Sequence, residues 1–129
     1  MHFGYTIVYV PDVAEAIAFY ETAFGFRRRF VSEDGGYGEL DSGDTTLSFA
    51  HHSMAGVLGI EISPATADAP APGIELAFVT EDVEDGFRAA VAAGATAVTA
   101  PHPMPWGQIV SYVRDLNGVL IEICSPVSA

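Results

Sequence analysis

The strongest constraint on this fold is an internal repeat, because one order of secondary-structure signals occurs twice within 129 residues. In the first half, a β-branched and aromatic segment at 4–10 is followed by an amphipathic helical pattern. The second half shows the same strand pattern at 74–80, again followed by a helical pattern. Three short segments with strand character follow each helical pattern, separated by turn residues. The sequence therefore predicts a strand, a helix and three strands, formed twice.

Both predicted helices begin at an aspartate that can cap the first turn. Asp12 has Glu15 three residues after it, as in a capping box with Asp in the capping role, and Asp82 opens the second helix. Gly25 and Gly94 are positioned to end the two helices. Asp12 and Asp82 lie 70 positions apart, and the same offset places Tyr5 on Glu75.

The closing hairpins of the two halves supply a second pair of matched positions. Asp41 matches Asp115 at an offset of 74 positions, and this offset places Ser48 on Glu122. Both pairs lie on predicted strands, the first strand and the last strand of each half. We therefore expect Tyr5, Ser48, Glu75 and Glu122 to point into one shared pocket.

Two of these residues are carboxylates within apolar strands. Glu122 lies between two isoleucines, and Glu75 lies between Ile74 and Leu76. Burying an ionised carboxylate is costly unless a metal, an arginine, a hydrogen-bond donor, a raised pKa or cavity water compensates. The alternative is an ordinary solvent-facing carboxylate on a half-buried strand. The repeat favours the cavity, because a single pocket explains both residues.

The charge of the chain restricts its partners. The net charge is −12, from 17 acidic residues against five arginines without any lysine. This balance argues against binding to nucleic acid or to an anionic membrane, and it favours a cationic or neutral small molecule. Three arginines form the run 27–29, which alternation in a strand would direct to opposite faces, so we interpret them as solvated or interface residues.

We expect residues 1–129 to form one domain, with a first module at about 3–50 and a second at about 74–125. Residues 51–73 are rich in Ala, Pro, Gly and Ser and form the predicted connection. An apolar run long enough to span a membrane is absent, and the first residues lack a leader pattern, so a cytoplasmic location is expected. The single cysteine, Cys124, is predicted to be a buried reduced thiol.

Trp106 lies in a loop rich in Pro, Met and Gly before the last hairpin. An aromatic ring at the mouth of a pocket supplies stacking area for a ring-bearing ligand. A packed loop or a dimer interface explains the same residue equally well. The four histidines, His2, His51, His52 and His102, do not coincide with the matched positions, and we interpret the loop histidines as solvated.

Three segments together resemble the vicinal-oxygen-chelate superfamily, which includes glyoxalases, extradiol dioxygenases and bleomycin-binding proteins. They are VYVPDVAEAIAFYETAFGF at 8–26, FVTEDVEDGFRAAVAAGA at 78–95 and WGQIVSYVRDLNGVLIEI at 106–123. The resemblance covers nearly the whole chain. It implies an α+β fold of two tandem βαβββ modules, whose eight strands form a curved mixed sheet around a cleft. It also implies a homodimer.

The resemblance also implies where a metal would bind. Metal-dependent members typically use two histidines and two glutamates on the first and last strands of each module. Tyr5, Ser48, Glu75 and Glu122 stand at those positions, and only Glu122 matches the usual ligand type. Glu122 and Glu75 are the candidate metal ligands, and their oxygens suit a hard divalent ion such as Mg, Mn or Ca.

Three functions remain open from the sequence. The first is a protein that binds a small aromatic or cationic molecule without transforming it, with Tyr5, Ser48, Glu75, Trp106 and Glu122 in its pocket. The second is a divalent-metal-dependent lyase, isomerase or dioxygenase acting on neighbouring substrate oxygens, with Glu75 as the base. The third is a metal-free enzyme using Tyr5 and Glu75 as an acid and base.

Overall fold

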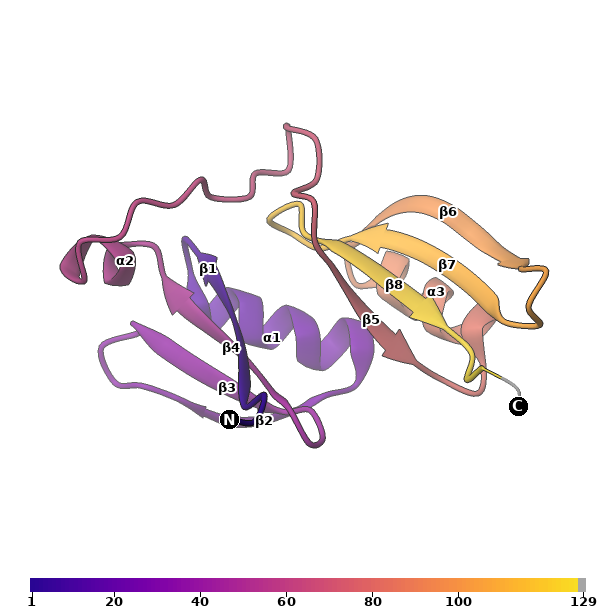
Figure 1. Ribbon diagram of the computed structural model, residues 1–129, viewed down its shortest axis with the longest axis horizontal. Helices are drawn as coiled ribbons and strands as arrows, with labels where there is room; N and C mark the ends of the chain where they lie inside the picture. The colour runs from indigo at the N-terminus through magenta and orange to yellow at the C-terminus, as the bar shows by residue number, and fades with distance from the viewer. Residues whose placement is uncertain (128–129) are drawn as a thin grey trace. The chain divides into compact units, whose positions relative to one another are not determined.

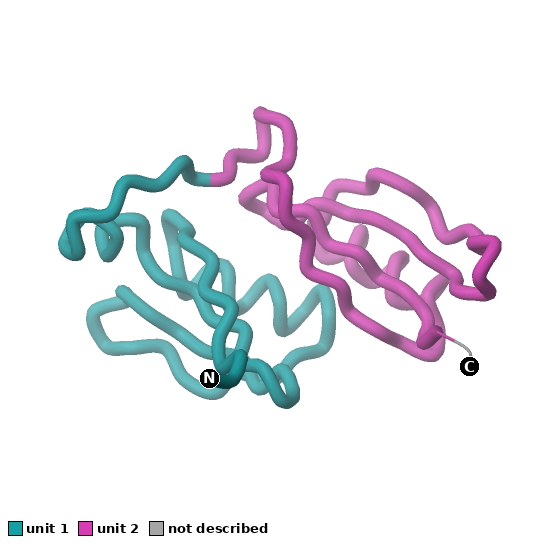
Figure 2. The backbone as a smooth tube through the Cα atoms, viewed as in Figure 1, with its two compact units in different colours: residues 1–64 teal, residues 65–129 magenta. Residues whose placement is uncertain are grey.

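The chain divides into two compact units in the computed structural model, which describes residues 1–127. The first unit comprises residues 1–64 and the second begins at residue 65 (Figure 2). The division falls inside the predicted connection at 51–73. Each unit is described by itself below.

The first unit is a four-stranded sheet with a helix against one face (Figure 1). Its elements are β1 (Tyr5–Val10), α1 (Val13–Phe24), β2 (Arg27–Val31), β3 (Tyr37–Asp41), β4 (Thr46–His51) and the short α2 (Ser53–Val57). The strand order is β1-β4-β3-β2, in which β1 runs parallel to β4 and the other pairs are antiparallel.

The second unit repeats this plan. Its elements are β5 (Glu75–Val79), α3 (Val83–Ala92), β6 (Thr96–Pro103), β7 (Ile109–Arg114) and β8 (Leu120–Cys124). The strand order is β5-β8-β7-β6, again with a parallel pair of first and last strands. The predicted α+β fold of two tandem βαβββ modules is therefore confirmed.

The predicted helix boundaries agree with the observed ones. The Asp12 carboxylate accepts a hydrogen bond from the Glu15 backbone N–H at 3.0 Å, and Asp82 caps α3 through Asp85 in the same way. Gly25 ends α1 with a positive φ of 76°, which a residue without a Cβ adopts readily. No helix within residues 1–127 is long and apolar enough to cross a membrane.

The core of the first unit lies between α1 and its sheet. Tyr20 of α1 and Phe49 of β4 are both fully buried, and their ring centroids are 4.9 Å apart. At Gly38 of β3, a Cβ would lie 3.1 Å from Val13 and 3.2 Å from Ile17, so the helix packs closely on this strand. Residues of the opposite alternation, including Ser48, face away from α1.

Strand register tests the repeat directly. Ile7 pairs with Ser48 in the first unit, and Ala77 pairs with Glu122 in the second. Register therefore confirms the difference of four positions between the two offsets. The strand starts agree with the offsets themselves, 70 from Tyr5 to Glu75 and 74 from Thr46 to Leu120. Ser48 and Glu122 hold the same position in their units.

The match of Asp41 with Asp115, from which the pair of Ser48 and Glu122 was found, was wrong. Glu39 pairs with Ser48 in the first unit, whereas Tyr112 pairs with Glu122 in the second, so β3 and β7 are related by 73 positions. Asp41 therefore corresponds to Arg114 and not to Asp115. The cause is one additional residue in the hairpin turn that joins β7 to β8.

The helix and sheet packing predicts the effect of removing a core ring. We expect Phe49→Ala to lower the free energy of unfolding by about 3–5 kcal/mol, because the ring is fully buried and leaves a cavity. Urea unfolding followed by circular dichroism measures this change. Phe3→Ala is the matched control, since Phe3 is 70% exposed, and we expect an effect within about 0.5 kcal/mol. Equal losses in the two variants would contradict the assigned core.

Candidate functional site

The two predicted carboxylates meet on the sheet face opposite α3. Glu75 is the first residue of β5, and Glu122 lies at the centre of the neighbouring strand β8. A hydrogen bond connects the two carboxyl groups. Tyr112 of β7 donates a hydrogen bond from its hydroxyl to Glu122 Oε1 at 3.1 Å. The half-buried Glu122 thus lies between a second carboxyl group and a phenol.

This proximity changes how Glu75 titrates. Partial desolvation raises the pKa of Glu75, and the charge of Glu122 and the hydrogen bond to it raise that pKa further. Two carboxylates in contact resist carrying two negative charges together. A proton or another cation between them relieves the repulsion.

The groups around Glu122 are held in their protonated forms. Burial and the hydrogen bond to Glu122 raise the pKa of Tyr112 to about 12, so its phenol is a neutral hydrogen-bond donor at physiological pH. Burial, followed by interaction with Glu122, raises the pKa of Cys124 to about 11. Cys124 is 2% exposed, in agreement with the buried reduced thiol predicted from the sequence. A thiol with this pKa is a weak nucleophile.

The first unit carries an acid on the corresponding face, but there it is neutralised. Glu39 of β3 accepts a hydrogen bond from Arg29 at 3.0 Å and another from the Tyr37 hydroxyl at 2.8 Å. Arg29 also reaches Thr46 Oγ1 at 3.1 Å. Sequence reasoning missed Glu39, although aligning β3 with β7 would have placed it at the position of Tyr112.

A β-bulge explains how Arg29 reaches this face. The register shifts between Arg28 and Phe30 in the first unit, and the same shift occurs between Ala97 and Thr99 in the second. The bulged residue is Arg29 in one unit and Val98, 52% exposed, in the other. The bulge therefore interrupts the strict alternation that was predicted for the run 27–29.

The carboxyl pair of the second unit has no comparable counterion. Within residues 65–127, neither Glu75 nor Glu122 forms an ion pair with an arginine or a histidine. Arg114 belongs to the neighbouring strand β7, but it donates to the backbone oxygens of Gly118 at 2.9 Å and Thr66 at 3.2 Å. The face opposite α3 therefore keeps an acidic pair without a positive partner among residues 65–127.

The two remaining matched residues lie in the first unit. Tyr5 opens β1 and is 57% exposed. Ser48 is completely buried, and its hydroxyl donates to the backbone oxygen of Thr6 at 3.4 Å. Because these residues and the carboxyl pair belong to different units, the shared pocket of all four stays a prediction.

Trp106 lies in the turn between β6 and β7, where the indole N–H holds it in place through a hydrogen bond. Its Nε1–H donates to Gln108 Oε1 at 2.9 Å, and Gln108 Nε2–H donates to the backbone oxygen of Ser125 at 3.0 Å. The Gln108 side chain also interacts with the Cys124 thiol. The indole remains 55% exposed, so its ring is oriented and accessible.

The residues at the four positions where the family resemblance implies metal ligands do not fit a divalent ion. The described part of the chain contains no cluster of three or more His, Cys, Asp or Glu side chains that could hold a metal ion. The Ser48 hydroxyl is buried and engaged with the backbone. Of the histidines, His51 Nδ1 accepts a hydrogen bond from the Ser53 N–H at 3.1 Å, and His102 Nδ1 lies 3.2 Å from Ala100 O.

A family model and solved structures that resemble this chain carry related family descriptions. A family model described as Glyoxalase/Bleomycin resistance protein/Dioxygenase superfamily matches residues 2–123. A glyoxalase-related enzyme from Fulvimarina pelagi superimposes with a TM-score of 0.82 at 17% identity, covering 98% of this chain and 88% of its own. A glyoxalase/bleomycin resistance protein/dioxygenase family enzyme from Burkholderia phytofirmans PsJN gives 0.78 at 22%, covering 97% and 98%. Curated proteins gave no match.

The contact between the carboxyl groups predicts a coupled titration. We expect Glu122→Gln to lower the pKa of Glu75, because the variant removes a neighbouring negative charge. The pKa should stay above its ordinary value, since partial desolvation is the larger cause. Carboxyl carbon chemical shifts, followed by NMR against pH, measure it. Glu81→Gln, with the same charge change in an exposed loop, should leave it unchanged. An unaltered Glu75 pKa in Glu122→Gln would contradict the contact.

The environment of Cys124 predicts slow alkylation. At pH 8, a pKa of about 11 in place of 9.0 leaves roughly 100-fold less thiolate, and burial slows the reaction further. We therefore expect iodoacetamide to react with the folded protein more than about 100-fold more slowly than with the same chain unfolded in urea. Mass spectrometry measures both rates, and a difference smaller than tenfold would show that the thiol is accessible.

Proposed function

We propose, since the chain belongs to the Glyoxalase/Bleomycin resistance protein/Dioxygenase superfamily, that this member binds a small organic cation without transforming it. The carboxyl pair of Glu75 and Glu122 receives the positive group. One observation carries the proposal: two carboxyl groups in contact, without an ion-pair partner among residues 65–127.

The electrostatics of the face favour a cation. The negative charge of Glu122 is one cause of the raised pKa of Glu75, and a positive group bound between the two carboxylates relieves their repulsion. The net charge of −12 adds a long-range attraction for cations. A planar amidinium or guanidinium can form two parallel hydrogen bonds with a carboxylate, as Arg–carboxylate pairs do.

The rest of the ligand is proposed to contain a ring. Trp106 offers an exposed indole, and its hydrogen bond to Gln108 fixes the orientation of the ring. Gln108 in turn bonds to Ser125, so the indole lies near the C-terminal end of β8. Stacking on such a ring adds apolar contact and, for a cation, attraction to the aromatic face. A homodimer and a cytoplasmic location, both expected from the sequence, stay predictions.

An enzymatic role has less support. The raised pKa of Glu75 is a property of a general base, but the donor set does not fit the divalent ion that would stabilise developing charge. The Tyr5 and Glu75 pair belongs to two separate units. The metal-free reaction that uses Tyr5 and Glu75 therefore stays a prediction.

Benzamidine and its uncharged analogue benzamide test the proposal. Benzamidine should bind, and benzamide should bind at least about tenfold more weakly, because only the first presents a planar cation. Calorimetry gives both affinities, and the fluorescence of the single tryptophan reports contact with Trp106. Affinity for benzamidine should rise with pH through the raised pKa of Glu75, since deprotonation completes the negative pair.

Two variants of equal charge separate a specific site from general attraction. Glu122→Gln should weaken benzamidine binding at least about tenfold, and Glu81→Gln should leave it unchanged. Equal affinities in Glu122→Gln and the unaltered protein, or equal affinities for benzamidine and benzamide, would overturn the proposal.

A further inference from the structure

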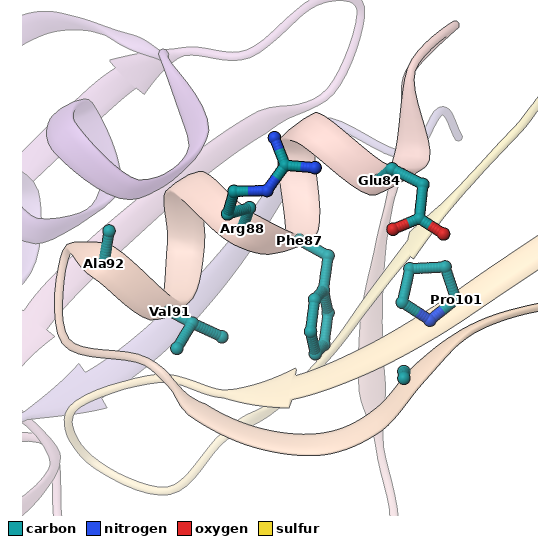
Figure 3. A pocket seen from close by; sticks show the side chains of 7 residues that line it. Glu84, Phe87, Arg88, Val91, Ala92 and Pro101 are labelled. Carbon is teal, nitrogen blue, oxygen red and sulfur yellow. The ribbon is translucent and has the colours of Figure 1, made fainter.

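A hollow lies between α3 and β6, on the helix side of the second sheet (Figure 3). Its volume is about 510 Å³, within the range of small-molecule sites. Its lining includes Glu84, Phe87, Arg88, Val91, Ala100 and Pro101. At Gly86 of α3, a Cβ would lie 3.2 Å from Ile123, which alternates with Glu122 along β8. The hollow is therefore on the opposite side of this sheet from the carboxyl pair.

The internal repeat shows one difference between the two units on the helix side of the sheet. In the first unit, Arg28 of β2 bridges to Glu21 of α1, with Nη2 and Oε1 3.0 Å apart. The offsets of 70 for the helices and 69 for the bulged strands place Val91 and Ala97 at the corresponding positions. The second unit thus replaces an ion pair between helix and edge strand by two short apolar side chains.

The walls of the hollow suit an apolar ring. The half-buried Phe87 directs its ring from α3 toward β6, and Val91, 39% exposed, lies beside it (Figure 3). On the opposite wall, Ala100 and Pro101 lie at a second register shift of β6, between Thr99 and His102. Pro101 has no backbone N–H, so this part of the wall presents no main-chain donor.

The charges at the rim favour a cation over an anion. The Glu84 carboxylate is directed to the β6 side of α3, as the Phe87 ring is, whereas the Arg88 guanidinium points away from them (Figure 3). Arg88 also lies 3.8 Å from the Asp85 carboxylate. The net charge of −12 acts in the same direction.

We propose that this hollow is a second ligand site, which takes a small arylalkylammonium compound. The ring lies between Phe87, Val91 and Pro101, and the ammonium group contacts Glu84. This site is separate from the carboxyl pair of the proposed function, and it does not depend on that proposal.

Three compounds of similar shape test the site: 2-phenylethylamine, 2-phenylethanol and phenylacetate. In NMR titrations, the amine should shift the signals of Phe87, Val91 and Ala92. It should bind about threefold more tightly than the alcohol, the size of an exposed ion pair, and phenylacetate should bind most weakly. Glu84→Gln should remove the preference for the amine over the alcohol.

The repeat itself supplies the variant that closes the hollow. Val91→Glu with Ala97→Arg rebuilds the ion pair of the first unit, and we expect it to abolish the shifts at Phe87. Ala92→Phe fills the same space from an exposed helix position and serves if the double variant does not fold. Both variants should retain benzamidine binding at Glu75 and Glu122, so failure of one site is distinguishable from failure of the other.

Any of three results would overturn the inference. One is a titration in which all three compounds leave Phe87 and Val91 unshifted. The second is binding at these residues that persists unchanged in a folded variant with the hollow filled. Shifts confined to Tyr112 and Trp106 would assign the amine to the carboxyl pair and would also reject the second site.

Discussion

The parallel pairing of the first and last strands is the constraint on which each unit depends. Parallel strands cannot be joined by a tight turn, so the chain between β1 and β4 includes a helix and two further strands. The helix buries one sheet face, and the core forms there around Tyr20 and Phe49 in the first unit. The opposite face presents the alternate residues, among them Ser48 in one unit and Glu122 in the other.

The two units share a backbone plan down to the β-bulge, so their side chains can be compared at matched positions. On the face opposite the helix, Arg29 neutralises Glu39 in the first unit, while Glu75 and Glu122 contact each other in the second. On the helix side, an ion pair in the first unit is replaced by apolar residues in the second. The second unit thus lacks the ion pair of the first unit on one side of its sheet and carries a carboxyl pair on the other.

Much of the second unit's site could be predicted, because alternation and the repeat are both properties of the sequence. Together they placed Glu75 and Glu122 on one face, and strand register agrees with this placement. Glu39 was missed because an error of one position on β3 hid its equivalence to Tyr112. Alternation also fails at a β-bulge, where an extra residue turns a side chain out of sequence, as for Arg29.

The sequence by itself determined the βαβββ repeat, the helix caps at Asp12 and Asp82, and the positions of Ser48 and Glu122, because local hydrophobic period and turn chemistry set these features. Tertiary structure alone decided which acids are neutralised and where space remains between helix and strand. Those outcomes depend on contacts between residues distant in the chain, such as the bond from Tyr112 to Glu122 and the bridge from Arg28 to Glu21. Hydrogen bonds of this kind require exact side-chain reach across strands, which periodicity does not encode.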